Sequence, residues 1–343
     1  MITKVGVVGC GYWGKNIIRN LFAAKNCRVI ALADNNKTEL AELKSQYPSV
    51  KTFPSADMLL NLKEIDAVAI ATPMTSHYRL VVEALKRRKH VLVEKPLACT
   101  ISECVNLIEV SRGIKRTLMV DHTFLYTGAV QKIKELIDGG DIGDILYYDS
   151  VRVNLGLFQK DRNVIWDLAP HDISIMNFLL GSSAPTVVSA RGLDHINRGI
   201  EDVAYMNVMF RGKIMANFHF NWLAPVKTRL TLIGGTKKMI VYDDAEPSEK
   251  IKVYDKGVKK IKGKKGEKFQ PLYDYRTGDM YAPKIDLSEP LRKVCEEFGR
   301  CAYTGKKPLS DGVAGLRVVE IISAAEKSIK NNGQNIHVKK TKV

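Results

Sequence analysis

Three residues of this sequence have side chains that could take a proton from an alcohol, namely Lys95, Asp167 and His171. Oxidation of a secondary alcohol releases a hydride and a proton, and the proton needs a base that titrates near neutral pH. Imidazole, with an ordinary pKa of about 6.5, is such a base. Asp167 and His171 are four residues apart in one expected helix, so both side chains project from the same face. Asp167 is then placed to orient a hydroxyl or to support an imidazolium.

Lys95 stands in the run Glu94-Lys95-Pro96, directly after an apolar strand pattern. Its ammonium can fix a hydroxyl and stabilise a developing alkoxide, and a desolvated lysine can also accept the proton itself. Pro96 fixes the turn that aims Lys95, and a cis bond before it is compatible with such a turn. Glu94 is expected to hold the lysine in place. These residues leave open whether Lys95 or His171 is the proton acceptor.

A glycine-rich loop near the N-terminus has the pattern G-x-G-x-x-G, in the run Gly9-Cys10-Gly11-Tyr12-Trp13-Gly14. The loop follows an expected strand and opens an expected helix, which is the context of a dinucleotide-binding loop. The first glycine permits a tight turn, the second lets a pyrophosphate approach, and the third permits close helix–strand packing. The free N–H groups of the helix start suit the phosphates. We therefore expect Gly9, Gly11, Tyr12, Trp13 and Gly14 to contact a dinucleotide.

Asp34 ends the next expected strand, twenty residues after Gly14. A carboxylate there can accept both hydrogen bonds of an adenosine ribose diol, and it repels a 2′-phosphate. Asn35 and Asn36 offer no arginine for such a phosphate, although Lys37 could reach one. We expect NAD as the cofactor, with NADP less favoured. The alternative role of Asp34 is the N-cap of the following helix, and both roles can coexist.

Two later segments are expected beside the same cofactor. Thr72 and Pro73 follow the apolar run 67–71, at the carboxyl edge of the sheet, where ligands bind in such folds. His77 begins the next helix, where it either lines the cofactor groove or packs against the sheet. Glu94 and Lys95 follow the next strand and complete the expected cofactor contacts.

Residues 1–122 alternate short apolar runs with helical patterns, which is typical of a parallel sheet covered on both faces by helices. The sequence thus predicts an N-terminal α/β Rossmann domain with a doubly wound parallel sheet. The expected strands are 5–9, 29–33, 67–71, 90–93 and 117–120.

Residues 123–343 have a different pattern, in which apolar and polar residues alternate over longer segments. Such a period of two favours a large, mostly antiparallel, open-faced sheet in an α+β domain. Helices are expected at 129–137, at about 166–180, at 290–304 and at 313–330. The expected strands are 145–153, 187–191, 203–210, 214–222, 227–233 and 239–242, with turns at Gly212-Lys213 and Gly234-Gly235.

Net charge, cysteine spacing and the length of apolar runs indicate which partners and which cellular compartment to expect. Net charge is +16, and nine of the nineteen residues in 250–268 are Lys. We interpret this stretch as a solvated loop or edge hairpin, with attraction of a phosphate-bearing substrate or of nucleic acid as alternatives, and we expect no nucleic-acid partner. Six cysteines form no C-x-x-C pair, which favours free thiols in a reducing cytoplasm and no metal site. No apolar run approaches the roughly 20 residues that a bilayer requires, so no membrane partner is expected.

In order along the chain, four features resemble the glucose–fructose oxidoreductase and inositol dehydrogenase family, often written Gfo/Idh/MocA. They are the glycine loop with Asp34, Glu94-Lys95-Pro96-Leu97, Ile142-Gly143-Asp144-Ile145, and Trp166-Asp167-Leu168-Ala169-Pro170-His171-Asp172. The resemblance covers nearly the whole chain. It implies hydride transfer to or from nicotinamide, a substrate between two domains, and a homodimer or homotetramer formed through the open sheet face. Lys95 matches the active-site lysine of the family, while Asp167 and His171 match its carboxylate and its usual proton acceptor.

A further similarity, in residues 221–229 and 241–244, is to the branch of that family that acts on nucleotide-linked sugars. It implies oxidation or reduction at C3 of a sugar such as that of UDP-N-acetylglucosamine. Asn154 and Arg229 are candidate substrate contacts beside Lys95, Asp167 and His171. The alternatives are a dehydrogenase of free inositol or sugar, a keto-sugar-nucleotide reductase, a glycosidase that acts by transient oxidation with bound NAD, and a dinucleotide-binding regulator without activity.

Overall fold

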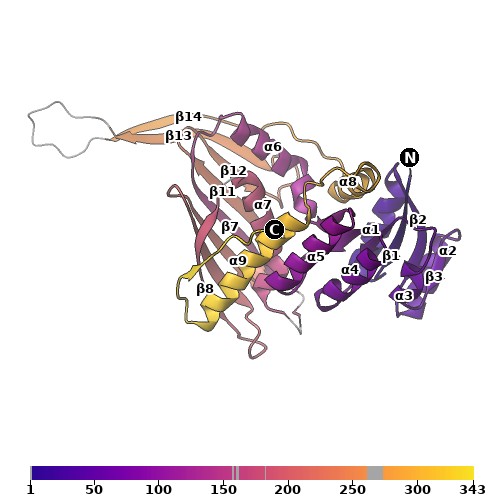
Figure 1. Ribbon diagram of the computed structural model, residues 1–343. Coiled ribbons are helices and arrows are strands. Elements are labelled where there is room, and N and C mark those ends of the chain that lie inside the picture. The colour runs from indigo at the N-terminus through magenta and orange to yellow at the C-terminus, as the bar shows by residue number, and fades with distance from the viewer. Residues whose placement is uncertain (1, 157, 160–161, 182, 261–272) are drawn as a thin grey trace, which may run out of the picture. The chain divides into compact units, whose positions relative to one another are not determined.

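A computed structural model describes residues 2–156, 158–159, 162–181, 183–260 and 273–343 (Figure 1). By packing, the chain divides into two units. The first unit contains Met1–Thr127, Ser288–Ser323 and Lys340–Val343, and the second contains Gly128–Leu287 and Ala324–Lys339. The boundary expected after residue 122 falls within the first segment of the first unit.

The sheet of the first unit has six strands in the order β3-β2-β1-β4-β5-β6, and every neighbouring pair is parallel. The strands are β1 (Thr3–Val8), β2 (Cys27–Ala33), β3 (Lys51–Phe53), β4 (Ala67–Ile70), β5 (His90–Glu94) and β6 (Leu118–Asp121). The strand order reverses between β1 and β4, which makes the carboxyl ends of these strands the binding edge of a doubly wound sheet. The expected Rossmann fold is confirmed.

The α-helices of the first unit are α1 (Tyr12–Ala23), α2 (Lys37–Gln46), α3 (Ala56–Leu60), α4 (His77–Lys86), α5 (Ile101–Gly113) and α8 (Pro290–Thr304). Two 3₁₀ turns, η1 (Met74–Ser76) and η2 (Thr123–Tyr126), follow β4 and β6. The sequence did not predict α5, although Thr100 and Glu103 form a reciprocal capping box at its start. It also missed β3 and α3, whose few residues carry too short a pattern to recognise.

Over the residues that the structure describes, the sheet of the second unit has nine strands in the order β14-β13-β12-β11-β7-β10-β9-β8-β15. All neighbours are antiparallel except β10 and β7, as expected for a mostly antiparallel sheet. The strands are β7 (Ile145–Leu155), β8 (Pro185–Leu193), β9 (Val203–Phe210), β10 (Met215–Asn221), β11 (Leu223–Gly235), β12 (Met239–Asp243), β13 (Ile251–Lys260), β14 (Tyr273–Tyr281) and β15 (Ile336–His337). The described helices of this unit are α6 (Gly128–Asp138) and α7 (Val164–Leu180), and α9 (Gly312–Lys330) begins in the first unit and ends in this one.

Alternating burial along β9 explains why this sheet has one covered face. Ala204, Met206 and Val208 are buried, whereas the alternating positions Tyr205 and Met209 are exposed. Apolar side chains at every second position pack beneath α7, which lies against β7, β9 and β10. The opposite face carries exposed side chains and is the open face that the alternation predicts.

Two expected turns differ in outcome. Gly212 and Lys213 both have positive φ, 83° and 66°, between β9 and β10, as a tight hairpin requires. Gly234 and Gly235 instead end β11, and the turn to β12 is 236–238. The described part of the Lys-rich stretch forms β13, which pairs with β14 at the sheet edge, as one of the interpretations expected. Residues 261–268 of that stretch lie outside the described residues.

Within the described part of the chain, no helix is both long enough and apolar enough to span a membrane. Over the same residues, no three His, Cys, Asp or Glu side chains gather as metal ligands would. The six cysteines are free thiols, and only Cys99 is not fully buried.

Candidate functional site

The glycine loop has the shape that a pyrophosphate needs. Gly9 has φ +93°, and a Cβ atom there would lie 2.5 Å from the carbonyl oxygen of Ala71. A Cβ atom on Gly14 would collide with the carbonyl oxygen of Gly9, whereas one on Gly11 would meet nothing within 4 Å. Gly11 caps α1 without a side-chain hydrogen bond to the first turn. Because the backbone at Gly11 is open and no side chain bonds to the first N–H groups of α1, this region fits the phosphates of a dinucleotide.

Asp34 lies at the end of β2 and is tied to this loop. Its Oδ2 accepts a hydrogen bond of 2.6 Å from the backbone N–H of Cys10, and its Oδ1 accepts one of 2.8 Å from Asn36. The N-cap of α2 is Asn36, whose side chain accepts from the backbone of Thr38 and Glu39. The alternative role of Asp34 as that N-cap was therefore wrong. Each Asp34 oxygen still has an unused lone pair, so the residue fits a ribose diol.

His77 joins two loops at the carboxyl edge of the sheet. Its Nδ1 lies 2.8 Å from the carbonyl oxygen of Pro96, and its Nε2 lies 2.9 Å from that of Thr72. The side chain is fully buried at the start of α4. Of the two roles considered for His77, the structure shows the packed one, since the ring fixes the loop after β4 against the turn after β5. Tyr12 is 86% exposed and Trp13 38%, so both remain accessible beside the glycine loop.

The Glu94-Lys95-Pro96 segment closes β5, and the Lys95–Pro96 bond is cis, as the sequence allowed. Lys95 is partly exposed, whereas Glu94 is buried. Glu94 Oε2 accepts a hydrogen bond of 3.2 Å from the backbone N–H of Lys95. Thus the Glu94 side chain supports the backbone of Lys95.

Asp121 and His122, at the end of β6, were not among the expected site residues. Asp121 is 2% exposed, and His122 is 1% exposed. Asp121 accepts hydrogen bonds from the indole N–H of Trp13, at 3.3 Å, and from the Thr123 hydroxyl, at 2.5 Å. Burial lowers the pKa of His122 to about 3, and the charge of Lys95 adds to this effect. A polar run at a strand end, Asp121-His122-Thr123, is the sequence pattern that could have identified them.

In the second unit, α7 presents Asp167 and His171 from the same face, four residues apart. Asn163 caps this helix, because its side chain accepts from the backbone of Trp166 and donates to Glu201. Asp167 Oδ2 accepts a hydrogen bond of 3.3 Å from the indole of Trp222. Both Asp167 and His171 are partly exposed in a helix whose other residues are mostly buried. The pair is therefore held on a rigid element while it stays accessible.

A buried ion pair lies beneath that helix. Arg152 of β7 donates to both carboxylate oxygens of Asp172, at 2.6 and 3.1 Å, and the two side chains are 5% and 4% exposed. Asp172 therefore makes a contact between helix and strand. Arg152 is occupied by this pair. Asn154, two residues along β7, is partly exposed on the same side of the strand.

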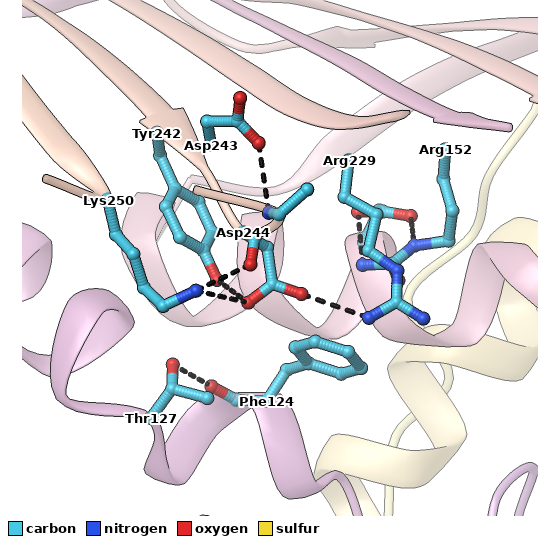
Figure 2. A network of polar contacts seen from close by, with 10 residues as sticks. Phe124, Thr127, Arg152, Arg229, Tyr242, Asp243, Asp244 and Lys250 are labelled. Atoms are coloured by element: carbon cyan, nitrogen blue, oxygen red, sulfur yellow. Dashed lines mark hydrogen bonds and ion pairs between the residues drawn. The ribbon is translucent and has the colours of Figure 1, made fainter. Parts of the chain in front are cut away.

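Arg229 belongs to a second polar network, which Figure 2 shows around Asp244. Arg229 Nη1 donates to Asp244 Oδ2 at 3.0 Å, and the Tyr242 hydroxyl donates to Oδ1 at 3.1 Å. Lys250 donates to the backbone oxygen of Asp244 at 2.5 Å. Arg229 faces Arg152 across the β11–β7 pairing and is one-third exposed. The Asp244 carboxylate thus forms ion pairs with two cations, Arg229 at 3.0 Å and Lys250 at 3.9 Å.

Comparison with known proteins identifies the class of this chain. Residues 3–122 match the model of an oxidoreductase family with an NAD-binding Rossmann fold, and residues 130–241 match a GFO/IDH/MocA C-terminal domain. The chain belongs to the Gfo/Idh/MocA family. It is an NAD-dependent oxidoreductase that acts on CH–OH groups, as the four sequence features predicted.

Among individual proteins, the chain is similar to 2,7-anhydro-N-acetylneuraminate hydratase of Escherichia coli, with 28% identity over 72% of this chain and 69% of that protein. It is 30% identical to inositol 2-dehydrogenase 2 of Saccharopolyspora erythraea, over 55% of this chain and 57% of that protein. The fold is similar to that of UDP-N-acetylglucosamine 3-dehydrogenase from Acidithiobacillus ferrooxidans, with a TM-score of 0.78 and 23% identity, over 96% of this chain and 98% of that one.

Proposed function

We propose that this chain transfers a hydride between NAD and a secondary alcohol of a sugar, at C3 of a nucleotide-linked sugar. The observation that carries the proposal is the pair Asp167 and His171, accessible on one face of the capped helix α7. Lys95, after β5, supplies the cation that such a reaction needs. The similarity in fold to a UDP-N-acetylglucosamine 3-dehydrogenase, and a net charge of +16 that attracts a diphosphate, favour the nucleotide-linked substrate.

In this proposal NAD supplies the hydride acceptor, and residues of the chain manage the proton. His171 accepts the hydroxyl proton, and Asp167 orients the hydroxyl or supports the imidazolium. Lys95 donates a hydrogen bond to the same oxygen as negative charge develops on it, or accepts the proton in place of His171. Asn154 and Arg229 are proposed substrate contacts, because both are partly exposed on the covered side of the sheet. The proposal makes Lys95 and His171 parts of one reaction.

We also propose a homo-oligomer in the cytoplasm. The open sheet face carries Tyr205 and Met209, which are 55% and 40% exposed, and a second copy would cover such side chains. The six free thiols suit a reducing compartment. Sedimentation of the purified chain, with Tyr205→Glu as the variant, tests the assembly: the variant is expected to shift the chain toward monomer, and an unchanged sedimentation coefficient would contradict the proposal.

The function is tested by incubating the protein with NAD and a panel of substrates while NADH absorbance is followed. The panel contains UDP-sugars, the same sugars without nucleotide, and inositols, each also assayed with NADP. We expect NADH formation with a UDP-linked sugar, and no NADH from its 3-deoxy derivative, which lacks the hydroxyl to be oxidised. Turnover of the free sugars or inositols alone would replace the nucleotide-linked substrate by the free one. If neither the UDP-linked sugars nor the free sugars and inositols gave NADH, the proposed dehydrogenase reaction would be contradicted.

A second candidate is a reaction in which the substrate is oxidised only transiently and NAD is regenerated. The similarity to a hydratase of an anhydro sugar favours it, because that relative is 28% identical over 72% of this chain. In that case purified protein would retain bound NAD and convert an anhydro sugar or a chromogenic glycoside without net NADH. Stoichiometric accumulation of NADH would decide against this candidate.

A further inference from the structure

Two carboxyl groups lie side by side in the interior of the first unit. Glu94 and Asp121 are direct partners in the parallel pairing of β5 and β6. They are 9% and 2% exposed. Two ionised carboxylates on directly paired residues repel each other, and burial removes the water that would screen their charges. Buried neighbours of this kind are stable when one proton lies between them.

The hydrogen bonds divide the two groups into a donor and an acceptor. Asp121 receives the indole N–H of Trp13 on Oδ2 and the Thr123 hydroxyl on Oδ1, so both of its oxygens act as acceptors. Glu94 Oε1 is buried and receives no hydrogen bond from the described donors. A proton on Glu94 would give this side chain a partner, because its carboxyl lies within hydrogen-bonding reach of Asp121.

The electrostatic surroundings agree with that division. Burial raises the pKa of Glu94 well above its ordinary value, and the charge of Asp121 and the hydrogen bond to it raise the pKa further. The charge of Lys95 acts in the opposite direction and does not overcome these effects. These effects favour the protonated form of Glu94.

We propose that Asp121 is a positioning residue of the active site, which holds one negative charge against protonated Glu94 and ties Trp13 to the Lys95 turn. Trp13 lies in the first turn of α1, between Gly11 and Gly14, and Lys95 follows Glu94 directly. Asp121 thus links the glycine loop to the proposed catalytic lysine through three hydrogen bonds. Trp13 donates to Asp121, protonated Glu94 donates to Asp121, and the backbone N–H of Lys95 donates to Glu94. The inference rests on the proposed function only in taking Lys95 as a catalytic residue.

The test compares two substitutions that remove one carboxyl each. Glu94→Gln imitates a protonated glutamic acid, since its amide can donate to Asp121. Asp121→Asn removes the charge and places a second donor opposite Glu94. We expect Asp121→Asn to lose about tenfold or more in kcat beyond the loss in Glu94→Gln, since small displacements of reacting groups are costly. Equal losses, or a larger loss in Glu94→Gln, would overturn the assignment.

Binding of NADH, measured by fluorescence without any sugar, keeps the inference testable if the substrate is another one. Asp121→Asn and Trp13→Phe are each expected to weaken NADH binding, and the double variant is expected to be no weaker than Asp121→Asn alone. Additive losses would show that Trp13 and Asp121 act independently. Asp57→Asn, the same change at an exposed position, is the matched control. If Asp121→Asn binds NADH as this control does, Asp121 has no positioning role.

The proton itself has a spectroscopic signature. Infrared difference spectra of wild type and Glu94→Gln should show the C=O stretch of a protonated carboxyl, present only in wild type. This measurement needs neither substrate nor activity. Should Asp121→Asn fail to fold, Thr123→Val removes one donor to the same carboxylate and is expected to weaken NADH binding in the same direction. A missing carboxyl band, or NADH binding unaffected in Thr123→Val and Trp13→Phe, would disprove the proposal.

Discussion

Asp34 accepts the backbone N–H of Cys10 at 2.6 Å, so the end of β2 is bonded directly to the glycine loop. The carboxylate that would recognise the adenosine ribose therefore also holds the loop that would receive the pyrophosphate. Cofactor choice and loop geometry both depend on the Asp34 side chain. Substitutions that keep its hydrogen bond but remove its charge can separate the two effects.

The first prediction concerns Asp34. Asp34→Ala is expected to weaken NAD binding at least tenfold, because a hydrogen bond to a charged group contributes about 1.5–3 kcal/mol. Asp34→Asn keeps an acceptor for the Cys10 N–H and loses the charge that repels a 2′-phosphate. It is expected to raise the ratio of kcat/KM for NADP to that for NAD while binding NAD better than Asp34→Ala does. An unchanged cofactor ratio in both variants would contradict the proposed ribose contact.

A second prediction contrasts two glycines of the same loop. Gly11→Ala meets nothing within 4 Å, so the thermal midpoint should stay within about 2 °C while the added methyl group blocks the pyrophosphate. Gly14→Ala collides with the backbone of Gly9 and is expected to destabilise the first unit by about 1–3 kcal/mol. Thermal unfolding with and without NAD measures both effects. If NAD raises the thermal midpoint of both variants as much as that of wild type, this loop does not hold the dinucleotide.

The third prediction concerns the proposed catalytic groups. Lys95→Ala and His171→Ala are each expected to lower kcat by about 10²–10⁴-fold, the range for loss of general acid–base catalysis, with NADH binding retained. His195→Asn is the matched control, since His195 has a side chain that is 49% exposed and pairs with Asp202. Full activity in both alanine variants would show that the proton acceptor lies elsewhere.

The pH profiles of these two variants identify the proton acceptor. If His171 takes the proton, the ionisation seen in the pH profile of kcat/KM should disappear in His171→Ala and persist in Lys95→Ala. The reverse pattern would assign the proton to Lys95. Both profiles need the same substrate, so this experiment follows the panel assay.

A fourth prediction is that stability falls in weak acid. Burial lowers the pKa of His122 to about 3 and that of His90 to about 4, so both rings are neutral in the folded chain. The unfolded chain binds these protons near pH 6.5, and the stability from each ring is therefore complete above that pH and is lost as the pH falls toward the folded pKa. Each ring contributes a slope of up to about 1.4 kcal/mol per pH unit.

Urea unfolding between about pH 7.5 and about pH 5 measures that slope. His122→Asn is expected to make it shallower, whatever its effect on stability at neutral pH, because one proton-binding group is gone. His337→Asn, at an exposed position in β15, should leave the slope as in wild type. A slope equally steep in His122→Asn would mean that another group causes the acid loss.

Local patterns predicted much of the fold. Helix α7 was expected at about 166–180 and spans Val164–Leu180, and α8 has the bounds expected for it. From the sequence, Asn36 was considered only as a residue that offers no arginine to a 2′-phosphate, whereas in the structure it caps α2. Helix α5 was missed because its polar and apolar residues do not follow a clear stripe, although its capping box was readable.

What the sequence by itself determined was local: the glycine loop, the four-residue spacing of Asp167 and His171, and the alternation that leaves one sheet face open. These follow from helix and strand periods within one segment, so a short window of residues suffices. Only the tertiary structure decided that Asp121 lies beside Glu94 and receives Trp13, 108 residues away. It also decided that residues 288–323 pack with the first unit. Such contacts depend on which strands and helices pair across the chain, and no periodicity within a segment encodes that pairing.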